Sequence, residues 1–410
     1  MRGRPPATAV AAAGAFVAVA VLVTVAWEVL GDAVTDIALY RTYGERVAGG
    51  LVPYRDFGFE YPPGALPALV LPALVTDSLD TYRVVFVAEL AVVGCLAVLA
   101  FDWALRASGR GERERVVVLT VLAAVPLLLG GVILTRFDLV PAALVAAAAA
   151  LMSVGRLRAA ALVVGVGVAV KLYPAVLVPL LAIAAWRRGG RREASIVVAL
   201  AALPAVLVYL PFLALAPDGV LDSFGRQLGR PLQMESLGSG ILLALHHTLG
   251  MSLEWASGSG SQNLTGRPAA ALAVAQGVAQ AGALVLVWIG FARGPATTER
   301  LLRFSAASLV AFVALSKVLS PQFLVWLVLL VPLVGGIRSR AALWLTVLAC
   351  ALTAVWFPAR YWELVREFDP LASWLVLVRG LTLVALLLVL TATEREPARS
   401  RSHAPSPGRT

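Results

Sequence analysis

Long apolar runs follow one another along nearly the whole of this 410-residue chain. Their length, about 17–25 residues, is what an α-helix needs to cross the roughly 30 Å hydrocarbon core of a bilayer. Backbone groups inside lipid must satisfy their own hydrogen bonds, and the runs lack the alternation of barrel strands, so they predict helices. Only 14% of the residues are charged, against about 25% in soluble domains. We therefore expect an all-α, polytopic integral membrane protein.

The first apolar run, residues 7–30, follows Arg2 and Arg4 and resembles a secretory signal. Its apolar part is longer than a signal-peptide core, and no small-residue cleavage site follows it. We interpret it as an uncleaved first helix.

Arginines gather in short connectors between the apolar runs, and they explain most of the net charge of +10. Clusters of this kind mark cytoplasmic loops, so the basic charge does not indicate nucleic-acid binding. This orientation gives about twelve helices with both termini inside. We expect them to form a single transmembrane domain over residues 1–392, followed by a disordered basic tail over 393–410. The predicted spans are 8–30, 83–105, 116–134, 137–154, 158–170, 172–186, 194–212, 268–292, 302–317, 321–336, 341–357 and 372–391.

The apolar piece near residues 62–76 contains Pro67 and Pro72 and is short for a crossing. If it crossed, every later arginine cluster would face outward. We therefore expect a re-entrant or broken helix on the outer side.

The opposite, external face then receives the polar loops. The first outer loop, residues 31–63, holds a dense group of charged and aromatic residues just after the first helix. A second long outer loop, residues 213–267, ends in GSGSQNLTG, which suggests a flexible segment. A polar active site on an apolar scaffold is the interpretation that we favour.

Asp36 is the principal catalytic candidate, because a carboxylate at the outer surface can act as general base on an acceptor hydroxyl. It can equally be a solvated loop acid or cap the next helix. The other residues of this loop that we assign to substrate binding are Tyr40, Arg41, Tyr54, Arg55, Glu60 and Tyr61.

Two isolated lysines lie at outer turns of otherwise apolar sequence. Lys171 precedes Tyr173, and Lys317 precedes Gln322. Snorkelling to the interface is one explanation, and binding of an anionic group such as a lipid phosphate is the other. Arg379, within the last run, is either a third cation or a snorkelling one.

Two further polar groups complete the candidate site. Arg136 and Asp138 in the RFDLVP turn form either a structural ion pair or a binding element. Arg230, Gln233 and Glu235 lie in the segment RPLQMES. One interpretation is that they contact a sugar or lipid head group, and the other is that they belong to an ordinary solvated loop. No metal, Walker or dinucleotide motif is present in a fitting context, so we assign no metal and no cofactor.

Several segments together resemble the GT-C membrane glycosyltransferases of glycosyltransferase family 87, which are polyprenyl-phosphate-mannose-dependent α-mannosyltransferases. They are LYRTYGERVAGGLVPYRDF and EYPP after Asp36, then RFDLVPAAL, KLYPAVLVPLL, RPLQMESLGS and SPQFLVWL, in this order.

The resemblance implies that Asp36 deprotonates the acceptor and that the sugar carbon is inverted. Lys171, Lys317 and Arg136 would hold the departing phosphate, with Glu60 and Tyr61 near the sugar or acceptor. The implied partners are the lipid bilayer, a polyprenyl-phosphate sugar donor and a glycolipid or glycan acceptor, with the site on the extracytoplasmic face of the cell membrane.

Three alternatives stay open from the sequence alone. A transporter or flippase of lipid-linked sugars is disfavoured because the ionisable residues lie near the outer surface and no internal repeat is evident. The second alternative is a related enzyme that uses another lipid-linked sugar, such as arabinose. The third is a non-catalytic scaffold for envelope assembly.

Overall fold

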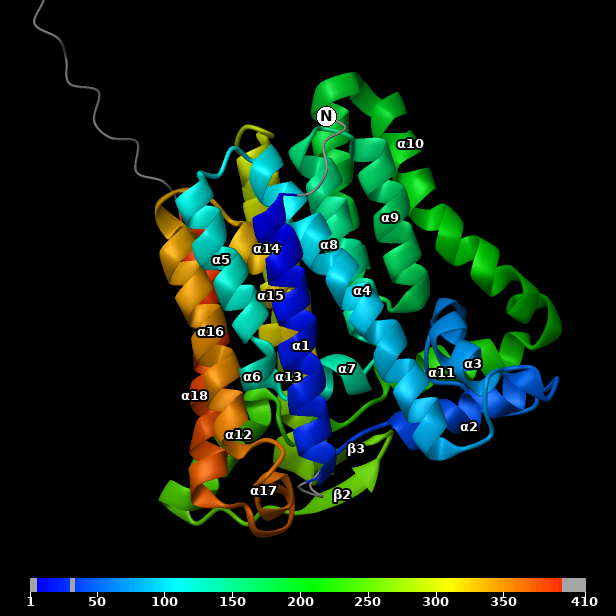
Figure 1. The fold of residues 1–410 in the computed structure, drawn as a ribbon. Coiled ribbons are helices and arrows are strands. Elements are labelled where there is room, and N and C mark those ends of the chain that lie inside the picture. The colour runs from blue at the N-terminus through cyan, green and yellow to red at the C-terminus, as the bar shows by residue number, and fades with distance from the viewer. Residues whose placement is uncertain (1–5, 30–33, 393–410) are drawn as a thin grey trace, which may run out of the picture.

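The computed structural model describes residues 6–29 and 34–392 as a bundle of helices with one small sheet (Figure 1). The predicted tail over 393–410 and residues 31–33 of the first outer loop lie outside the described residues. The α-helices are α1 (Ala7–Val29), α2 (Ile37–Ala48), α3 (Leu66–Ala73), α4 (Leu79–Ala107), α5 (Glu112–Ala124), α6 (Pro126–Leu129), α7 (Val132–Thr135), α8 (Leu139–Ser153), α9 (Leu157–Val170), α10 (Val178–Leu215), α11 (Pro217–Leu228), α12 (Leu237–Leu249), α13 (Arg267–Ala292), α14 (Thr298–Ala314), α15 (Phe323–Val328), α16 (Ser339–Trp356), α17 (Tyr361–Glu367) and α18 (Pro370–Thr391). Short 3₁₀ helices are η1 (Pro63–Ala65), η2 (Tyr173–Leu177), η3 (Val331–Leu333) and η4 (Gly336–Arg338), and the strands are β1 (Leu232–Gln233), β2 (Trp255–Gly258) and β3 (Ser261–Leu264).

Six helical segments of the described chain are long and apolar enough to cross a membrane. They are Ala7–Val29, Leu79–Ala107, Tyr173–Leu215, Arg267–Ala292, Gly336–Trp356 and Pro370–Thr391. Several other predicted spans correspond to shorter apolar helices, among them Leu139–Ser153 and Leu157–Val170. The all-α, multi-pass character is therefore confirmed, while the number of twelve crossings stays a prediction.

Glycines break the apolar runs at two places, one inside a predicted span and one between two predicted spans. The run predicted over 116–134 divides into α5, α6 and α7, because Pro126 starts a new turn and Gly130 adopts a positive φ of 63°. A Cβ at Gly130 would lie 1.9 Å from the Trp27 ring, so only glycine fits beside this side chain. In α10 the kink at Gly189 and Gly190 separates two helical halves, which match the predicted spans 172–186 and 194–212.

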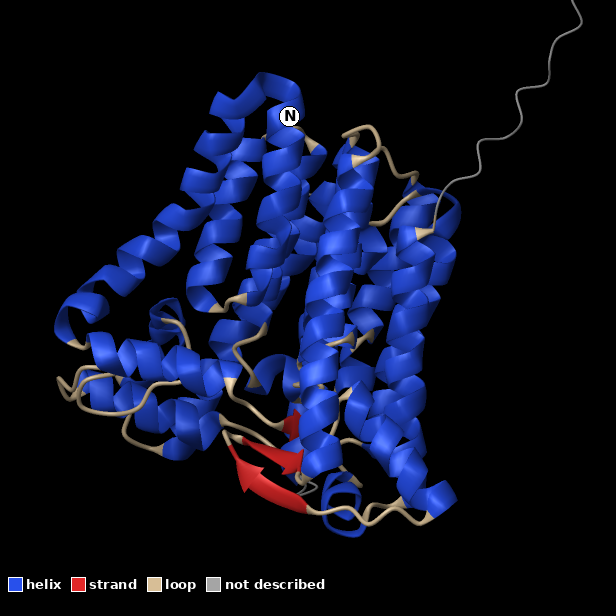
Figure 2. Cartoon of the chain, turned by 180° about the vertical axis from the view of Figure 1, so that it is seen from behind, coloured by secondary structure: helices blue, strands red, loops and turns tan. Residues whose placement is uncertain are grey.

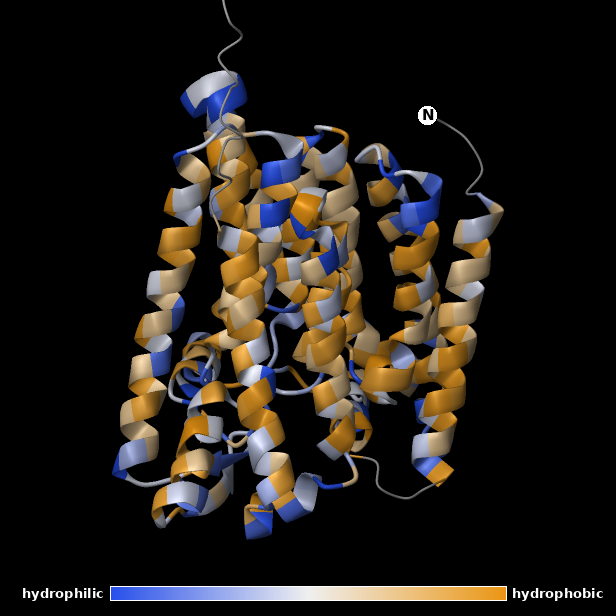
Figure 3. Ribbon diagram, turned by 90° about the vertical axis from the view of Figure 1, so that its left-hand side faces the viewer, coloured by the Kyte–Doolittle hydropathy of each residue, from blue (hydrophilic) through white to orange (hydrophobic). Residues whose placement is uncertain are grey.

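The arginine-rich connectors and the polar loops lie at opposite ends of the bundle (Figure 1). At the first end, the kink of α10 meets the α13–α14 connector, where Arg187 donates to the carbonyls of Ala292 and Gly294. Hydrophilic residues gather toward both ends, and hydrophobic residues dominate between them (Figure 3). This is the distribution that a membrane-spanning bundle requires.

The segment predicted as a re-entrant helix near 62–76 forms η1 and α3 at the end that carries the polar loops. It packs closely on its neighbours: the Tyr82 hydroxyl donates to the Leu69 carbonyl at 2.9 Å, and a Cβ at Gly44 would lie 2.2 Å from the same oxygen. Its position relative to the lipid stays a prediction.

A small antiparallel sheet, with strand order β1-β3-β2, lies at the same end (Figure 2). The predicted flexible loop GSGSQNLTG is instead the β2–β3 hairpin, so that expectation is wrong. Ser259 and Gly260 both have positive φ values, 53° and 68°, as a tight turn that matches strand twist requires. Sequence reasoning treated the glycines as a sign of flexibility and missed the turn.

The largest part of the core fills the bundle, and a second apolar cluster underlies the sheet. Leu232, Leu264 and Met234 pack there against Trp356 and Val376. This second cluster fixes the sheet to α16 and α18 and so positions the segment after β1, which carries candidate site residues.

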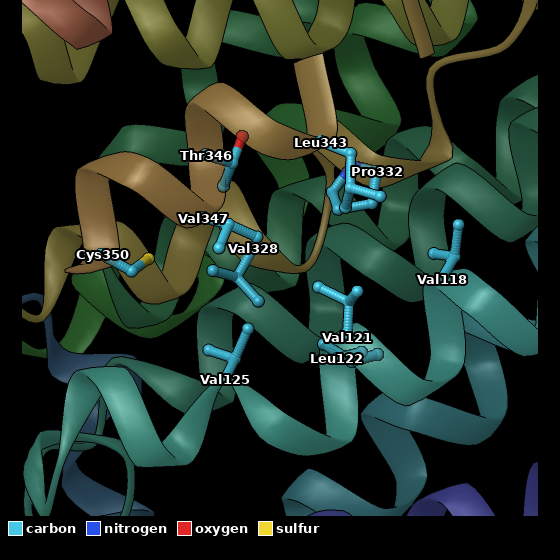
Figure 4. A pocket seen from close by; sticks show the side chains of 10 residues that line it. All are labelled: Val118, Val121, Leu122, Val125, Val328, Pro332, Leu343, Thr346, Val347 and Cys350. Atoms are coloured by element: carbon cyan, nitrogen blue, oxygen red, sulfur yellow. The ribbon is translucent and has the colours of Figure 1, made fainter. Parts of the chain in front are cut away.

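A cavity between α5, α15, η3 and α16 is the feature in Figure 4. Its volume is about 10 Å³, and its lining is apolar except for Thr346 and Cys350. Such a space holds one water molecule at most. It is a packing gap and has no role in recognising a sugar or a lipid.

Candidate active site

Asp36 immediately precedes α2, and its side chain is directed toward a buried arginine. Its carboxylate makes an ion pair with the Arg136 guanidinium and accepts a long hydrogen bond of 3.5 Å from the Tyr40 hydroxyl. It makes no side-chain capping bond to α2, so the capping alternative is not realised. With 33% of its side chain exposed, Asp36 is reachable by a substrate while it remains held in place.

Arg136 lies in the turn between α7 and α8, about 100 residues from Asp36 in sequence. Its side chain is only 8% exposed, and a second nitrogen donates to the Val34 carbonyl at 3.2 Å. Burial lowers the pKa of Arg136 to about 10, while the charges of Asp138 and Glu235 oppose that shift. The guanidinium therefore stays charged at neutral pH.

Lys171 and Asp138 form a second ion pair beside the first, with 2.7 Å between Nζ and Oδ1. The Trp326 indole also donates to this Asp138 oxygen, at 2.9 Å. The sequence offered no acidic neighbour for Lys171, and the fold supplies Asp138, which immediately precedes α8 and lies 33 positions earlier in the chain. Snorkelling does not describe this lysine, since its ammonium points into the protein.

Aromatic rings surround the Lys171 ammonium. Nζ lies 4.9 Å from the Phe137 ring centre, 5.4 Å from Trp326 and 5.9 Å from Tyr61. Each such contact stabilises a cation by about 0.5–2 kcal/mol when water is excluded. Tyr173 stacks on Trp326, with 3.8 Å between the ring centres, so it supports one wall of the cage.

Tyr40 and Tyr61 each lie beside one of the two ion pairs: the Tyr40 hydroxyl contacts Asp36, and the Tyr61 ring lies near Lys171. Their ring centres are 6.1 Å apart, and Tyr61 packs edge-on against Phe137 at 4.8 Å. Burial raises the pKa of Tyr40 and Tyr61 well above the usual value. Both phenols remain neutral hydrogen-bond donors, as recognition of sugar hydroxyls requires.

A second polar group follows strand β1. Gln233 donates to the Ser320 hydroxyl at 2.8 Å and to the Glu235 carboxylate, and Arg379 donates to the Glu235 carbonyl. Burial raises the pKa of Glu235 to about 7, against the opposing charges of Arg379 and Arg136. Arg379 is fully buried, which excludes the snorkelling alternative for it.

Arg230 and Lys317 place two positive charges close to one another. Burial lowers the pKa of Lys317, and the charge of Arg230 lowers it further. The Lys317 ammonium donates to the Leu228 carbonyl at 2.7 Å, and Arg230 donates to Ser261 at 3.1 Å. Neither cation makes an ion pair within residues 6–29 and 34–392, so neither charge is directly neutralised by a carboxylate there.

The two groups lie within electrostatic reach of one another. The charge of Glu235 favours the protonated form of Arg136 in the first group and so raises its pKa. Glu60 and Tyr61 raise the pKa of Arg230 in the second group in the same way. The Glu60 carboxylate also lies near the β2–β3 turn, 3.4 Å from where a Cβ on Gly260 would be. The candidate site thus includes the start of α2, the α7–α8 turn, the segment just before η2, and strand β1 with the residues that follow it.

Other predicted site residues have structural partners elsewhere. Arg41 pairs with Glu45 at 2.6 Å, and Arg55 pairs with Asp56 at 2.9 Å on the surface. The Tyr54 hydroxyl donates to the Tyr61 carbonyl at 2.5 Å, which fixes the loop below the site. Gln322 occupies the position before α15, with no hydrogen bond to the other candidates in the described chain.

Sequence reasoning missed three residues of this site. Phe137 and Trp326 hold Lys171, and Tyr361 of α17 lies within electrostatic reach of both Glu235 and Arg136. Phe137 and Tyr361 lie in segments already expected at the outer face, so their position near the polar loops was the available signal. Trp326 lies within the predicted span 321–336, and nothing in that apolar run distinguished it from a core residue. Within residues 6–29 and 34–392, no group of three or more His, Cys, Asp and Glu residues is placed to hold a metal ion.

Six apolar helices of membrane-spanning length in the described part of the chain indicate a multi-pass membrane protein, and the charged and aromatic group at one end is its candidate active site. The chain matches the model of Glycosyltransferase family 87 over residues 59–321, which is more than half of its length. It therefore belongs to this family and is a membrane glycosyltransferase. A comparison with curated proteins gave no match.

The matched region includes most of the candidate site, from Glu60 through Arg136, Lys171 and Arg230 to Lys317. It begins after Asp36 and Tyr40 and ends before Gln322 and Arg379. The family match therefore does not cover Asp36, and its proposed role depends on the resemblance of the flanking sequence and on the geometry of this structure.

Proposed function

We propose that the protein transfers mannose from a polyprenyl-phosphate donor to a glycolipid or glycan acceptor of the cell envelope, with inversion and with Asp36 as general base. The observation that carries the proposal is the pairing of a partly exposed carboxylate, Asp36, with Arg136 beside the caged Lys171. A base and two phosphate-binding cations are what this reaction requires.

In the proposed reaction the acceptor hydroxyl oxygen bonds to the anomeric carbon as the bond from that carbon to the phosphate oxygen breaks. The acceptor proton goes to Asp36, and polyprenyl phosphate leaves with one more negative charge than it had in the donor. The phosphate is a good leaving group, so no general acid is needed. Cations placed where the charge develops stabilise the transition state.

The ion pair between Asp36 and Arg136 implies that the donor binds before the acceptor is deprotonated. While Arg136 is paired with Asp36, the carboxylate is a weak base, because an adjacent positive charge favours its ionised form. A donor phosphate competes for the guanidinium, and its binding leaves Asp36 free to accept the proton. Arg230 and Lys317, which lack carboxylate partners in the described chain, add the remaining positive charge.

The outer half of α10 offers a surface for the polyprenyl chain. Leu203, Val206, Leu207 and Leu210 expose between 44% and 58% of their surface on this half. The α10 backbone approaches α9 closely at Gly165, where a Cβ would lie 2.4 Å from the Ala201 carbonyl. An apolar helix face on the lipid side, leading to the end that carries Lys171, suits an isoprenoid donor.

The separation of the arginine connectors from the site supports an extracytoplasmic active site in the cell membrane. Arginine-rich loops stay on the cytoplasmic side, and the candidate site lies at the opposite end of the bundle (Figure 1).

The test is sugar transfer by the purified chain in liposomes, with labelled polyprenyl-phosphate mannose and extracted envelope glycolipids as acceptors. A parallel reaction receives the arabinose donor. Incorporation from the mannose donor supports the proposal, and incorporation from arabinose alone would replace mannose by that sugar. Movement of donor across the bilayer without any transfer would favour the flippase alternative.

A further inference from the structure

A separate basic pocket lies at the arginine-rich end, between the α8–α9 turn and the kink of α10. Its volume is about 510 Å³, and both segments lie at the top of Figure 1, away from the candidate active site. Both segments turn at a glycine with positive φ: Gly155 in the α8–α9 turn has a φ of 77°, and Gly190 in the kink has a φ of 70°. The pocket is lined by Gly155, Arg156, Leu157, Arg158, Ala159, Arg188, Gly189 and Glu193.

The charges lining this pocket are not balanced. Arg158 is neutralised by two contacts to Glu193, at 2.8 and 2.5 Å. Arg188 uses one nitrogen for the Gly155 carbonyl, at 3.1 Å, and the Arg156 side chain makes no hydrogen bond or ion pair within the described chain. Three arginines against one glutamate leave the lining with a net formal charge of +2.

An exposed tryptophan marks the level of this pocket in the bilayer. Trp186 lies directly before the kink, and 59% of its surface is exposed. Tryptophan is enriched at the membrane–water interface, at the depth of the lipid head groups. Arg188 and the α8–α9 turn therefore face head groups and not bulk water alone.

We propose that this pocket binds the phosphate head group of an anionic phospholipid in the adjacent leaflet. Basic pockets between transmembrane helices suit anionic head groups, and each arginine near the surface contributes about 1 kcal/mol. Arg156 and the remaining N–H groups of Arg188 contact the phosphate, while the acyl chains lie against the lipid-facing surface of α9 and α10. This site is independent of the proposed sugar transfer.

The experiment measures phosphatidylglycerol binding to the purified full chain by native mass spectrometry, with phosphatidylcholine as reference lipid. The test variant is R156Q/R188Q, and R293Q/R340Q is the matched control, which removes the same charge from the same end of the molecule outside the pocket. We expect phosphatidylglycerol to bind about 30-fold more weakly to R156Q/R188Q and unchanged to the control. R156Q alone removes no hydrogen bond or ion pair of the described chain and should weaken phosphatidylglycerol binding about 5-fold. This single variant keeps the proposal testable if the double variant misfolds.

Three outcomes would overturn the proposal. Equal losses in R156Q/R188Q and R293Q/R340Q would show only a general attraction to the basic end. Equal binding of phosphatidylglycerol and phosphatidylcholine would remove the anionic preference. Displacement of the lipid by inorganic phosphate at equal concentration would assign the pocket to a free anion.

Discussion

The two ends of this molecule use charge in opposite ways. At the arginine-rich end, side chains such as Arg187 bind backbone carbonyls, and Arg158 pairs with Glu193 at the surface. At the other end, Arg136 and Lys171 are held among carboxylates and aromatic rings, largely out of contact with water. We interpret the first group of cations as setting the orientation of the chain in the bilayer, and we propose that the second group serves the chemistry of sugar transfer.

Orientation tolerates loss of a single charge, because many arginines contribute to it. A site that holds ion pairs away from water does not tolerate the loss of one charge, because removing one partner leaves the other buried and unpaired. Substitutions of the same chemical kind should therefore have large effects at one end and small effects at the other.

The largest effect is expected from Asp138→Asn. This change leaves the Lys171 ammonium without its carboxylate, and breaking such a pair costs about 3–5 kcal/mol of stability. We expect a lower free energy of unfolding, measured by denaturant titration in detergent, together with loss of sugar transfer. The double variant Asp138→Asn/Lys171→Gln should be less destabilised than the sum of the two single variants. Simple additivity would show that the pair is not coupled.

The next effect concerns the unpaired cations Arg230 and Lys317. Changing either to Gln removes a charge-assisted hydrogen bond to the donor phosphate, so we expect the donor KM to rise at least about 10-fold. Kinetics at varied donor concentration measure this, with Arg191→Gln at the opposite end as the matched control. An unchanged donor KM in both Arg230→Gln and Lys317→Gln would remove these residues from the phosphate site.

A smaller, pH-dependent effect is expected from Glu235. Burial raises its pKa to about 7, so the carboxyl is mostly protonated below that pH and ionises above it. The ionised form competes with the donor phosphate for Arg136 and Arg230, and we therefore expect the donor KM to increase as pH rises through 7. In Glu235→Gln this increase should disappear. Persistence of the same pH profile in that variant would exclude Glu235 as its source.

The smallest effect is expected at the surface of the first outer loop. Arg55 is exposed and pairs only with its neighbour Asp56, and exposed pairs of this kind contribute little. Arg55→Gln should leave both sugar transfer and thermal unfolding unchanged. A large loss of transfer in this variant would extend the site to the loop surface and return Arg55 to the role predicted from sequence.

Much of the fold was predictable because membrane helices are local features. The apolar runs predicted the helical character and most helix positions. The arginine-rich connectors predicted which loops gather at one end of the bundle and which lie at the other. The hairpin of β2 and β3 was not predictable from composition, because the same Ser and Gly residues suit a flexible loop. The break at Gly130 inside the predicted span 116–134 depends on backbone geometry that periodicity does not report, whereas the kink at Gly190 falls between two predicted spans.

The candidate site was predictable in its residues and not in its pairing. Asp36, Arg136, Asp138 and Lys171 stood out as polar residues beside apolar runs. Their partners come from distant segments: Asp36 meets Arg136 only through the packing of α2 near the α7–α8 turn, and Trp326 arrives from α15. Such contacts are decided by tertiary structure, which the local sequence does not contain.

The most direct test of the account compares sugar transfer by Asp36→Asn with transfer by Asp56→Asn, at matched amounts of folded protein in liposomes with polyprenyl-phosphate mannose. Both changes remove one carboxylate from the same loop, but only Asp36 faces Arg136. We predict that Asp36→Asn lowers the transfer rate by about 10²–10⁴-fold, as loss of a general base does, while Asp56→Asn keeps the native rate. Native transfer by Asp36→Asn would contradict the assignment of Asp36 as the base.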